Sequence, residues 1–214
     1  GSTGIYCTNR RIFLQFVQYI MIVKRLLTDR AVELFRQYPV ITITGPRQSG
    51  KTTLAKLAFP DVPYINLEDM ETRSFALEDP RGFLNSYPNG AIFDEIQNVP
   101  DLTSYIQVYV DKAGKESMYV LTGRRHFELM EKVSQSLAGR TALLKLLPFS
   151  CEEIRDAYAR PGTDESLLKG FYPRIYDKGL EPTQALSDYY TTYVERDLRT
   201  ISNIHNINLF HKFV

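Results

Sequence analysis

The sequence predicts an α/β fold in which helices flank a five-stranded, mostly parallel sheet. Short apolar runs alternate with stretches whose apolar residues recur at helical spacing, and this alternation is typical of parallel strands joined by crossover helices. The length of 214 residues suits one α/β domain with a further segment. The composition, 43% hydrophobic and 24% charged, is that of an ordinary globular protein.

Apolar patterning and the residues that bound it place the individual elements. Apolar runs bounded by Gly, Pro or polar residues predict strands, whereas apolar residues three and four apart predict helices. Thr28 and Asp101 are expected to cap two helices, and Pro80 to break another. The expected strands are 40–44, 64–67, 91–93, 118–121 and 142–147, and the expected helices are 29–37, 51–57, 75–84, 102–110 and 127–137.

The alternation ends at Pro148, so we place the first domain at residues 21–150. Residues 151–214 are expected to form a helical extension that leads into a truncated C-terminal domain, because the chain ends on the apolar run LFHKFV. Within it we expect one helix and a polar turn over 150–169 and a long helix over 183–199. Residues 1–20 begin with Gly-Ser and are interpreted as a vector-derived or disordered leader.

One loop carries a phosphate-binding pattern. Residues 41–53 read ITITGPRQSGKTT, which places the pattern G-x-x-x-x-G-K-T between an expected strand and an expected helix. Backbone N–H groups of such a loop surround phosphate oxygens, and the following helix directs its positive end at the same anion. Lys51 is expected to contact the β- and γ-phosphates and Thr52 to hold Mg²⁺. The residues expected to contact the nucleotide are Gly45, Pro46, Arg47, Gln48, Ser49, Gly50, Lys51, Thr52 and Thr53.

An acidic pair follows the third expected strand. The run AIFDE delivers Asp94 and Glu95 to the carboxyl end of that strand, where ligands bind in open α/β sheets. Asp94 is expected to bind Mg²⁺, and Glu95 to act as the general base that activates water for attack on the γ-phosphate. The alternative is two solvated acids at a strand end. Because the strand 64–67 comes between the loop and this pair, we expect an extra strand between the two motif strands and the loop strand beside the fourth.

Polar and basic residues follow the fourth expected strand. Thr122 lies where a side chain can sense the γ-phosphate, and Arg124 and Arg125 follow it. A further cation, Arg140, ends the segment SLAGR. An arginine near the transferred phosphate stabilises transition-state charge, from its own chain or from a neighbouring subunit. A solvated or salt-bridging arginine is the alternative for each, and Arg140 is kept as a catalytic candidate beside Lys51 and Glu95.

The chain resembles the AAA-type ATPases of bacteria and archaea that join an N-terminal ATPase domain to a C-terminal domain of unknown function. Eight segments carry the resemblance in order: ITGPRQSGKTTL, NLED, FDEIQNVPDL, LTG, SLAGR, LLPFS, GFYPRIYD and DYYTTYVERDLR. It implies a P-loop NTPase three-layer sandwich, with ATP and Mg²⁺ as cofactors. It also implies Walker A roles for Gly45, Gly50, Lys51 and Thr52, and Walker B roles for Asp94 and Glu95.

The sequence departs from this family at one motif position. The family usually has a serine after LTG, and here that position is Arg124. The serine is a plausible phosphate sensor, so slower hydrolysis is our hypothesis for this chain.

The leading expectation is a Mg²⁺-dependent ATPase domain that acts as a switch or motor part for a downstream domain. A nucleotide-binding signalling module with little hydrolysis is the first alternative, and Arg124 favours it. A P-loop small-molecule kinase is the second, which Glu95 directly after Asp94 disfavours.

Charge and cysteine content set the expected surroundings and partners. The net charge is +1, and the basic residues Arg10, Arg11, Lys24 and Arg25 are interpreted as solvated, so nucleic acid is not indicated. Two cysteines and no apolar run of membrane-spanning length indicate a cytoplasmic protein. Besides ATP, the expected partners are the protein's own C-terminal domain and, as an open alternative, further copies of the chain.

Overall fold

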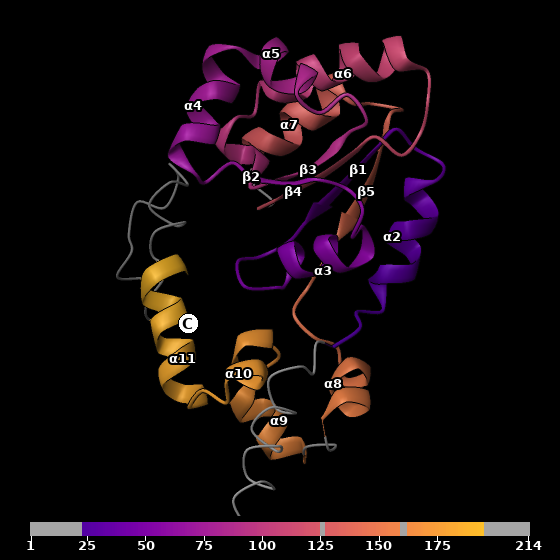
Figure 1. The fold of residues 1–214 in the computed structure, drawn as a ribbon. Helices are drawn as coiled ribbons and strands as arrows, with labels where there is room; N and C mark the ends of the chain where they lie inside the picture. Colours follow the sequence, from indigo (N-terminus) through magenta and orange to yellow (C-terminus); the bar gives the residue numbers. More distant parts are fainter. Residues whose placement is uncertain (1–22, 125–126, 159–161, 195–214) are drawn as a thin grey trace, which may run out of the picture. The chain divides into compact units, whose positions relative to one another are not determined.

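The structure is a computed structural model that describes residues 23–124, 127–158 and 162–194 (Figure 1). The chain divides into two compact units: the first spans Val23–Glu153, and the second contains the described residues from Ile154 onward. The expected leader, residues 1–20, lies outside the described residues.

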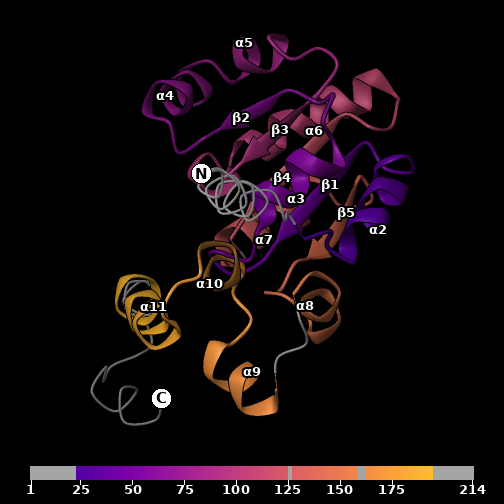
Figure 2. The ribbon, with the colours of Figure 1, turned by 60° about the horizontal axis from the view of Figure 1, so that its bottom comes forward.

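The first unit is built on one five-stranded sheet, and every pairing in it is parallel. The strand order is β2-β3-β4-β1-β5, as Figure 2 shows. The loop strand β1 pairs with β4, as expected; β4 separates it from β3, while β2 lies at the edge of the sheet. The strands are β1 (Val40–Thr44), β2 (Tyr64–Asn66), β3 (Ala91–Asp94), β4 (Tyr119–Gly123) and β5 (Thr141–Lys145).

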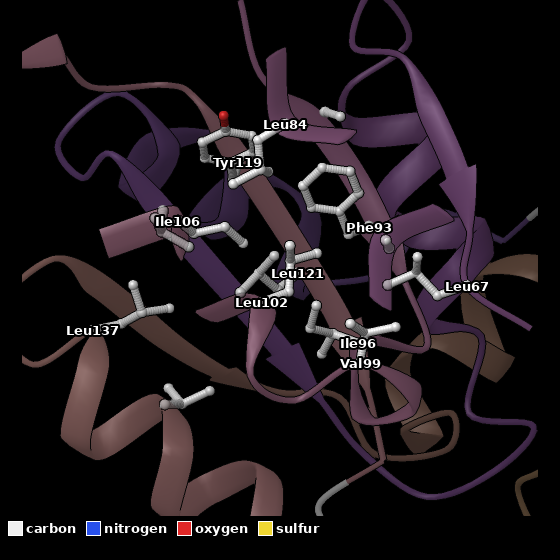
Figure 3. Packing of buried hydrophobic residues seen from close by; sticks show 14 of the residues in the cluster. Leu67, Leu84, Phe93, Ile96, Val99, Leu102, Ile106, Tyr119, Leu121 and Leu137 are labelled. Carbon is white, nitrogen blue, oxygen red and sulfur yellow. The ribbon is translucent and has the colours of Figure 1, made fainter. Parts of the chain in front are cut away.

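Helices cover both faces of the sheet and complete a three-layer sandwich (Figure 1). Successive side chains of a strand point to opposite faces, so Ile92 packs in one hydrophobic cluster and Phe93 in the other. In the cluster that contains Phe93, the ring of this residue stacks on the ring of Tyr119, with ring centroids 5.5 Å apart (Figure 3). One face is covered by α2 (Leu27–Phe35) and α3 (Lys51–Ala58), and the other by α4 (Met70–Glu78), α5 (Pro80–Asn85), α6 (Leu102–Ala113) and α7 (Phe127–Ser136).

The two expected helix caps are wrong. Helix α2 begins at Leu27, so Thr28 lies inside it. The reason is a tertiary contact, because the N–H of Leu26 donates to the carboxylate of Glu153 and orients the start of the helix. Asp101 does precede α6, but its side chain pairs with Lys132 at 2.7 Å and makes no capping bond. The break expected at Pro80 is confirmed, since α4 ends at Glu78 and α5 begins at Pro80.

The second unit is helical in its described part. One helix and a polar turn were expected over 150–169. The helix is α8 (Cys151–Ala157), which begins in the first unit, but a second helix, α9 (Thr163–Lys169), follows it, so the expectation of a single helix with a turn is wrong. Two more follow, α10 (Pro173–Lys178) and α11 (Pro182–Tyr189), and α11 continues as a π-helical turn over Tyr190–Val194. Residues 195–199 of the expected long helix lie outside the described residues. Among the helices described here, none has the length and apolar character that crossing a membrane requires.

Candidate nucleotide site

The phosphate-binding loop connects β1 to α3, and its glycines meet two different demands. A Cβ at Gly45 would lie 2.0 Å from the carbonyl oxygen of Leu146, so only glycine lets the two backbones approach this closely. Gly50 has φ 90° and ψ 21° at the start of α3, a left-handed conformation that costs glycine little. Gln48 also has a positive φ, 59°, so the loop holds a conformation that its sequence does not favour at every position.

Lys51 is the first residue of α3, and its side chain folds back onto this loop. Its side chain is buried, and Nζ donates to the carbonyl oxygens of Gly45 at 3.2 Å and Pro46 at 2.9 Å. Burial lowers the pKa of Lys51, while the nearby carboxylates of Glu95 and Asp94 oppose that shift. The loop lysine is therefore close to the acidic pair, as expected for a shared phosphate site.

Asp94 lies where three strands of the sheet approach the first turn of α3. Its buried carboxylate accepts hydrogen bonds from the hydroxyls of Thr52 and Tyr64, both at 2.7 Å, and from the hydroxyl of Thr122. Burial raises the pKa of Tyr64, and the hydrogen bond to Asp94 raises it further, so this hydroxyl stays a donor. The structure thus brings Thr52, Asp94 and Thr122 together, which the sequence had placed near one phosphate.

Tyr64 was not foreseen as a site residue. Its strand β2 pairs with β3 in a register that sets Asn66 beside Asp94. No residue pattern around Tyr64 distinguishes it from a packing tyrosine.

Glu95 is held by two neighbours. Its backbone is left-handed, with φ 58° and ψ 45°, and a short 3-10 helix, Ile96–Asn98, follows it. This geometry returns Gln97 toward Glu95, so the Gln97 amide donates to Glu95 Oε2, and Arg124 Nε lies 3.8 Å from the same oxygen. Gln97 Oε1 accepts from the backbone N–H of Arg124 at 3.2 Å. Gln97 therefore links the acidic pair to the end of β4, a role that no sequence spacing signalled.

The other predicted residues are more scattered. Arg47 is half-buried, and its charge lowers the pKa of Lys51 slightly, as does that of Arg124. Thr53 is exposed on the first turn of α3.

Arg140 directly precedes β5, at the amino end of the parallel sheet, whereas the loop follows the carboxyl end of β1. There its guanidinium binds both carboxylate oxygens of Asp111, at 2.5 and 2.8 Å, so the structure does not bring Arg140 to the loop of its own chain.

The position of Arg25 differs most clearly from what the sequence predicted for this site. The expectation that it is a solvated surface residue is wrong, because its side chain is 8% exposed. Its guanidinium donates to the carbonyl oxygen of Ser49, inside the phosphate-binding loop, at 2.6 Å.

The oxygen ligands of the site suit Mg²⁺ in its usual arrangement with phosphate. Mg²⁺ typically takes one or two protein oxygens and completes its shell with waters and substrate phosphates. Asp94 and Thr52 supply a carboxylate and a hydroxyl within 2.7 Å of each other. Across the described residues, no group of three or more His, Cys, Asp or Glu side chains forms an all-protein metal site. The ligand set therefore fits a metal that binds together with a nucleotide.

Replacing Arg124 by serine is expected to raise the rate of ATP turnover by about three- to tenfold. Arg124 pairs with the Glu95 carboxylate, and its removal ends the competition of the arginine with water for that group, while Gln97 still holds Oε2. Steady-state phosphate release by the parent and by Arg124→Ser measures the effect. Arg81→Ser, at an exposed position of α5, is the matched control. Equal rates in the parent and Arg124→Ser would remove any inhibitory role for Arg124.

Comparison with known proteins agrees with this geometry. A model of the AAA domain family matches residues 37–155, and a model of a domain of unknown function matches residues 160–214. Uncharacterized proteins of Mycobacterium tuberculosis and Mycobacterium bovis are each 30% identical over 185 residues, which is 85% of this chain and 41% of theirs. The chain thus spans about two fifths of the length of these curated relatives.

A solved structure shares the fold. The Walker-type ATPase of Pyrococcus abyssi superposes with a TM-score of 0.58 at 14% identity, over 86% of this chain and 77% of that one. Since the AAA match covers more than half of the sequence, this chain belongs to the AAA domain family of P-loop ATPase domains.

Proposed function

We propose that the chain binds ATP together with Mg²⁺ and hydrolyses it, as a switch or motor part for a C-terminal domain. The observation that carries this proposal is the 2.7 Å contact between Thr52 and Asp94, with Lys51 and Glu95 beside it. In P-loop ATPases a hydroxyl and a carboxylate so placed hold Mg²⁺ against the β- and γ-phosphates. Mg²⁺ would neutralise charge that develops on the phosphates.

The protein's own residues supply the remaining chemistry. The loop N–H groups and Lys51 bind the phosphates, and Lys51 exchanges its loop carbonyls for phosphate oxygens. Glu95 has one carboxylate oxygen held by Gln97 and Arg124, which leaves Oε1 to orient and deprotonate the attacking water. Arg140 acts, if it has a catalytic role, from a neighbouring copy in a homo-oligomer, because its own loop lies at the other end of the sheet.

A nucleotide-binding module with little hydrolysis is the second candidate. The ion pair between Arg124 and Glu95 favours it, because the arginine competes with water for the base. The two candidates share ATP binding and differ in turnover.

The test is ATP affinity and phosphate release by the parent with Mg²⁺ and with EDTA. Lys51→Met is expected to weaken ATP binding at least about tenfold, since it removes the buried cation of the loop. Lys112→Met, an exposed lysine of α6, is the matched control and should behave as the parent does. Turnover that survives EDTA or Lys51→Met would contradict the proposal. Tight Mg²⁺-dependent binding with no release of phosphate would favour the second candidate.

ATP affinity is expected to fall as the pH rises from neutral. In the free protein the pKa of Lys51 is lowered from 10.5, whereas bound phosphates would stabilise its charged form. Binding therefore favours the protonated lysine, and affinity is lost as pH rises through the lowered pKa. ATP titrations between about pH 7 and 10 measure this, and Lys51→Arg, whose charge persists in that range, should give a flatter profile. Parallel profiles for the two proteins would exclude Lys51 as the titrating group.

A further inference from the structure

Arg25 joins two segments that are far apart in the sequence. Its guanidinium donates to the carbonyl oxygen of Ser49 at 2.6 Å and to those of Leu147 and Pro148 at 2.7 and 3.2 Å. Nε donates to Glu153 at 2.9 Å, and the guanidinium carbon lies 5.0 Å from the centre of the Phe149 ring. One side chain thus contacts the phosphate-binding loop and the segment after β5.

The geometry of these bonds requires arginine. A guanidinium directs its N–H groups outward in one plane, so a single side chain reaches acceptors in three directions. A lysine carries its three donors on one nitrogen and cannot reproduce this fork. The charge is also compensated in place, because the partner Glu153 is 5% exposed and lies against Arg25.

Glu153 orders the other side of this cluster. Its Oε1 accepts from the backbone N–H of Leu26 at 2.8 Å as well as from Arg25, and its Oε2 accepts from the N–H of Ser150 at 2.8 Å. The Ser150 hydroxyl accepts from the N–H of Glu153 at 3.1 Å. Glu153 is also the last residue of the first unit, so the cluster ends where the chain passes into the second.

The bond to Ser49 bears directly on phosphate binding. In a trans peptide the C=O and the following N–H point in opposite directions. Because Arg25 holds the Ser49 carbonyl, the N–H of Gly50 points away from Arg25 and is restrained in that direction. Gly50 belongs to the set of loop residues whose N–H groups are expected to face phosphate.

We propose that Arg25 is a positioning residue that holds the phosphate-binding loop and the segment 147–153 together as one ordered body. Nucleotide bound in the loop then also restrains segment 147–153, which leads into the second unit. The nucleotide consequence rests on the proposed function, whereas the coupling of the two segments does not.

Backbone hydrogen exchange of the nucleotide-free protein tests the coupling. Arg25→Lys is expected to speed exchange in peptides covering 45–52 and 147–153 by at least about fivefold, and to leave peptides from α6 unchanged. Glu153→Gln should do the same in the loop, although Glu153 is bonded to Arg25 and not to Ser49. Lys24→Ala is the matched control, since Lys24 is the adjacent basic residue but is 68% exposed and pairs only with the surface residue Asp29 among described contacts.

The outcomes separate a positioning role from a merely structural one. Equal acceleration in every peptide of the first unit would mean general destabilisation and would overturn the proposal. So would a Glu153→Gln variant whose loop exchanges as slowly as the parent's.

A second arm adds ATP and Mg²⁺. In the parent we expect slower exchange at 45–52 and at 147–153, and in Arg25→Lys at 45–52 alone. Equal protection of 147–153 in both proteins would overturn the proposal. If ATP protects neither segment in the parent, the proposed function fails, and the nucleotide-free comparison decides the role of Arg25 by itself.

Discussion

Replacing Glu95 by glutamine is expected to lower the rate of ATP hydrolysis by about a hundredfold or more and to leave ATP affinity within about twofold. Glutamine keeps an oxygen that accepts from Gln97, so the left-handed turn at position 95 should persist. It loses the ability to take a proton from water, which is the step assigned to this residue. The loop contacts of Lys51 and the Thr52–Asp94 pair are untouched, which is why binding should survive.

Single-turnover phosphate release and ATP titration, measured on the same samples, separate the two effects. Glu116→Gln, at an exposed position after α6, removes a carboxylate of the same kind away from the loop and is the control. A Glu95→Gln variant with parental turnover would assign the base to another group. A variant that no longer binds ATP would show that Glu95 also organises the loop, beyond its role in taking a proton from water.

Replacing Gly45 by alanine is expected to lower the free energy of unfolding by about 3 kcal/mol and to abolish ATP binding. The added methyl would lie 2.0 Å from the carbonyl oxygen of Leu146, and Gly45 and Leu146 directly follow the paired ends of β1 and β5. Relief requires the loop to move away from the end of β5. The phosphate-binding N–H groups would move with it.

Urea unfolding measures the free energy of unfolding, and ATP titration measures whether the loop still binds the nucleotide. Gly114→Ala separates the cost of steric overlap from the cost of a left-handed backbone. Gly114 has φ 57°, but no atom lies within 4 Å of an added Cβ. That control should cost about 1 kcal/mol and leave binding intact. If Gly45→Ala costs no more than the control, the close approach to Leu146 is not what requires glycine at position 45.

The parts of the site that were predictable lie within short stretches of chain. The run Val40–Thr44 is a strand as expected, and the helix after the loop begins at Lys51 as expected. The meeting of Thr52 with Asp94 followed from one further rule, that parallel strands present their carboxyl ends at one edge. These features depend on patterns a few residues long and on a general property of α/β sheets.

The parts that were missed depend on contacts between distant segments. Tyr64 reaches Asp94 through strand pairing, and Gln97 reaches Arg124 across 27 positions. Neither residue type at its position differs in any local way from a packing tyrosine or a surface glutamine. The start of α2 was misplaced for the same reason, since Glu153, 127 positions away, accepts from Leu26.

The fold class, the phosphate-binding loop and the acidic pair were predictable from the amino-acid sequence, because β-branched runs, glycine spacing and carboxylates at strand ends are visible within short stretches of chain. The side chains that surround these motifs are known from the folded chain. The fold buries Arg25 between the loop and the segment after β5, and it sets Arg140 against Asp111 at the opposite end of the sheet. A charged side chain carries no local signal of its burial, because whether it is solvated or buried depends on the carbonyls and carboxylates that the fold brings within reach.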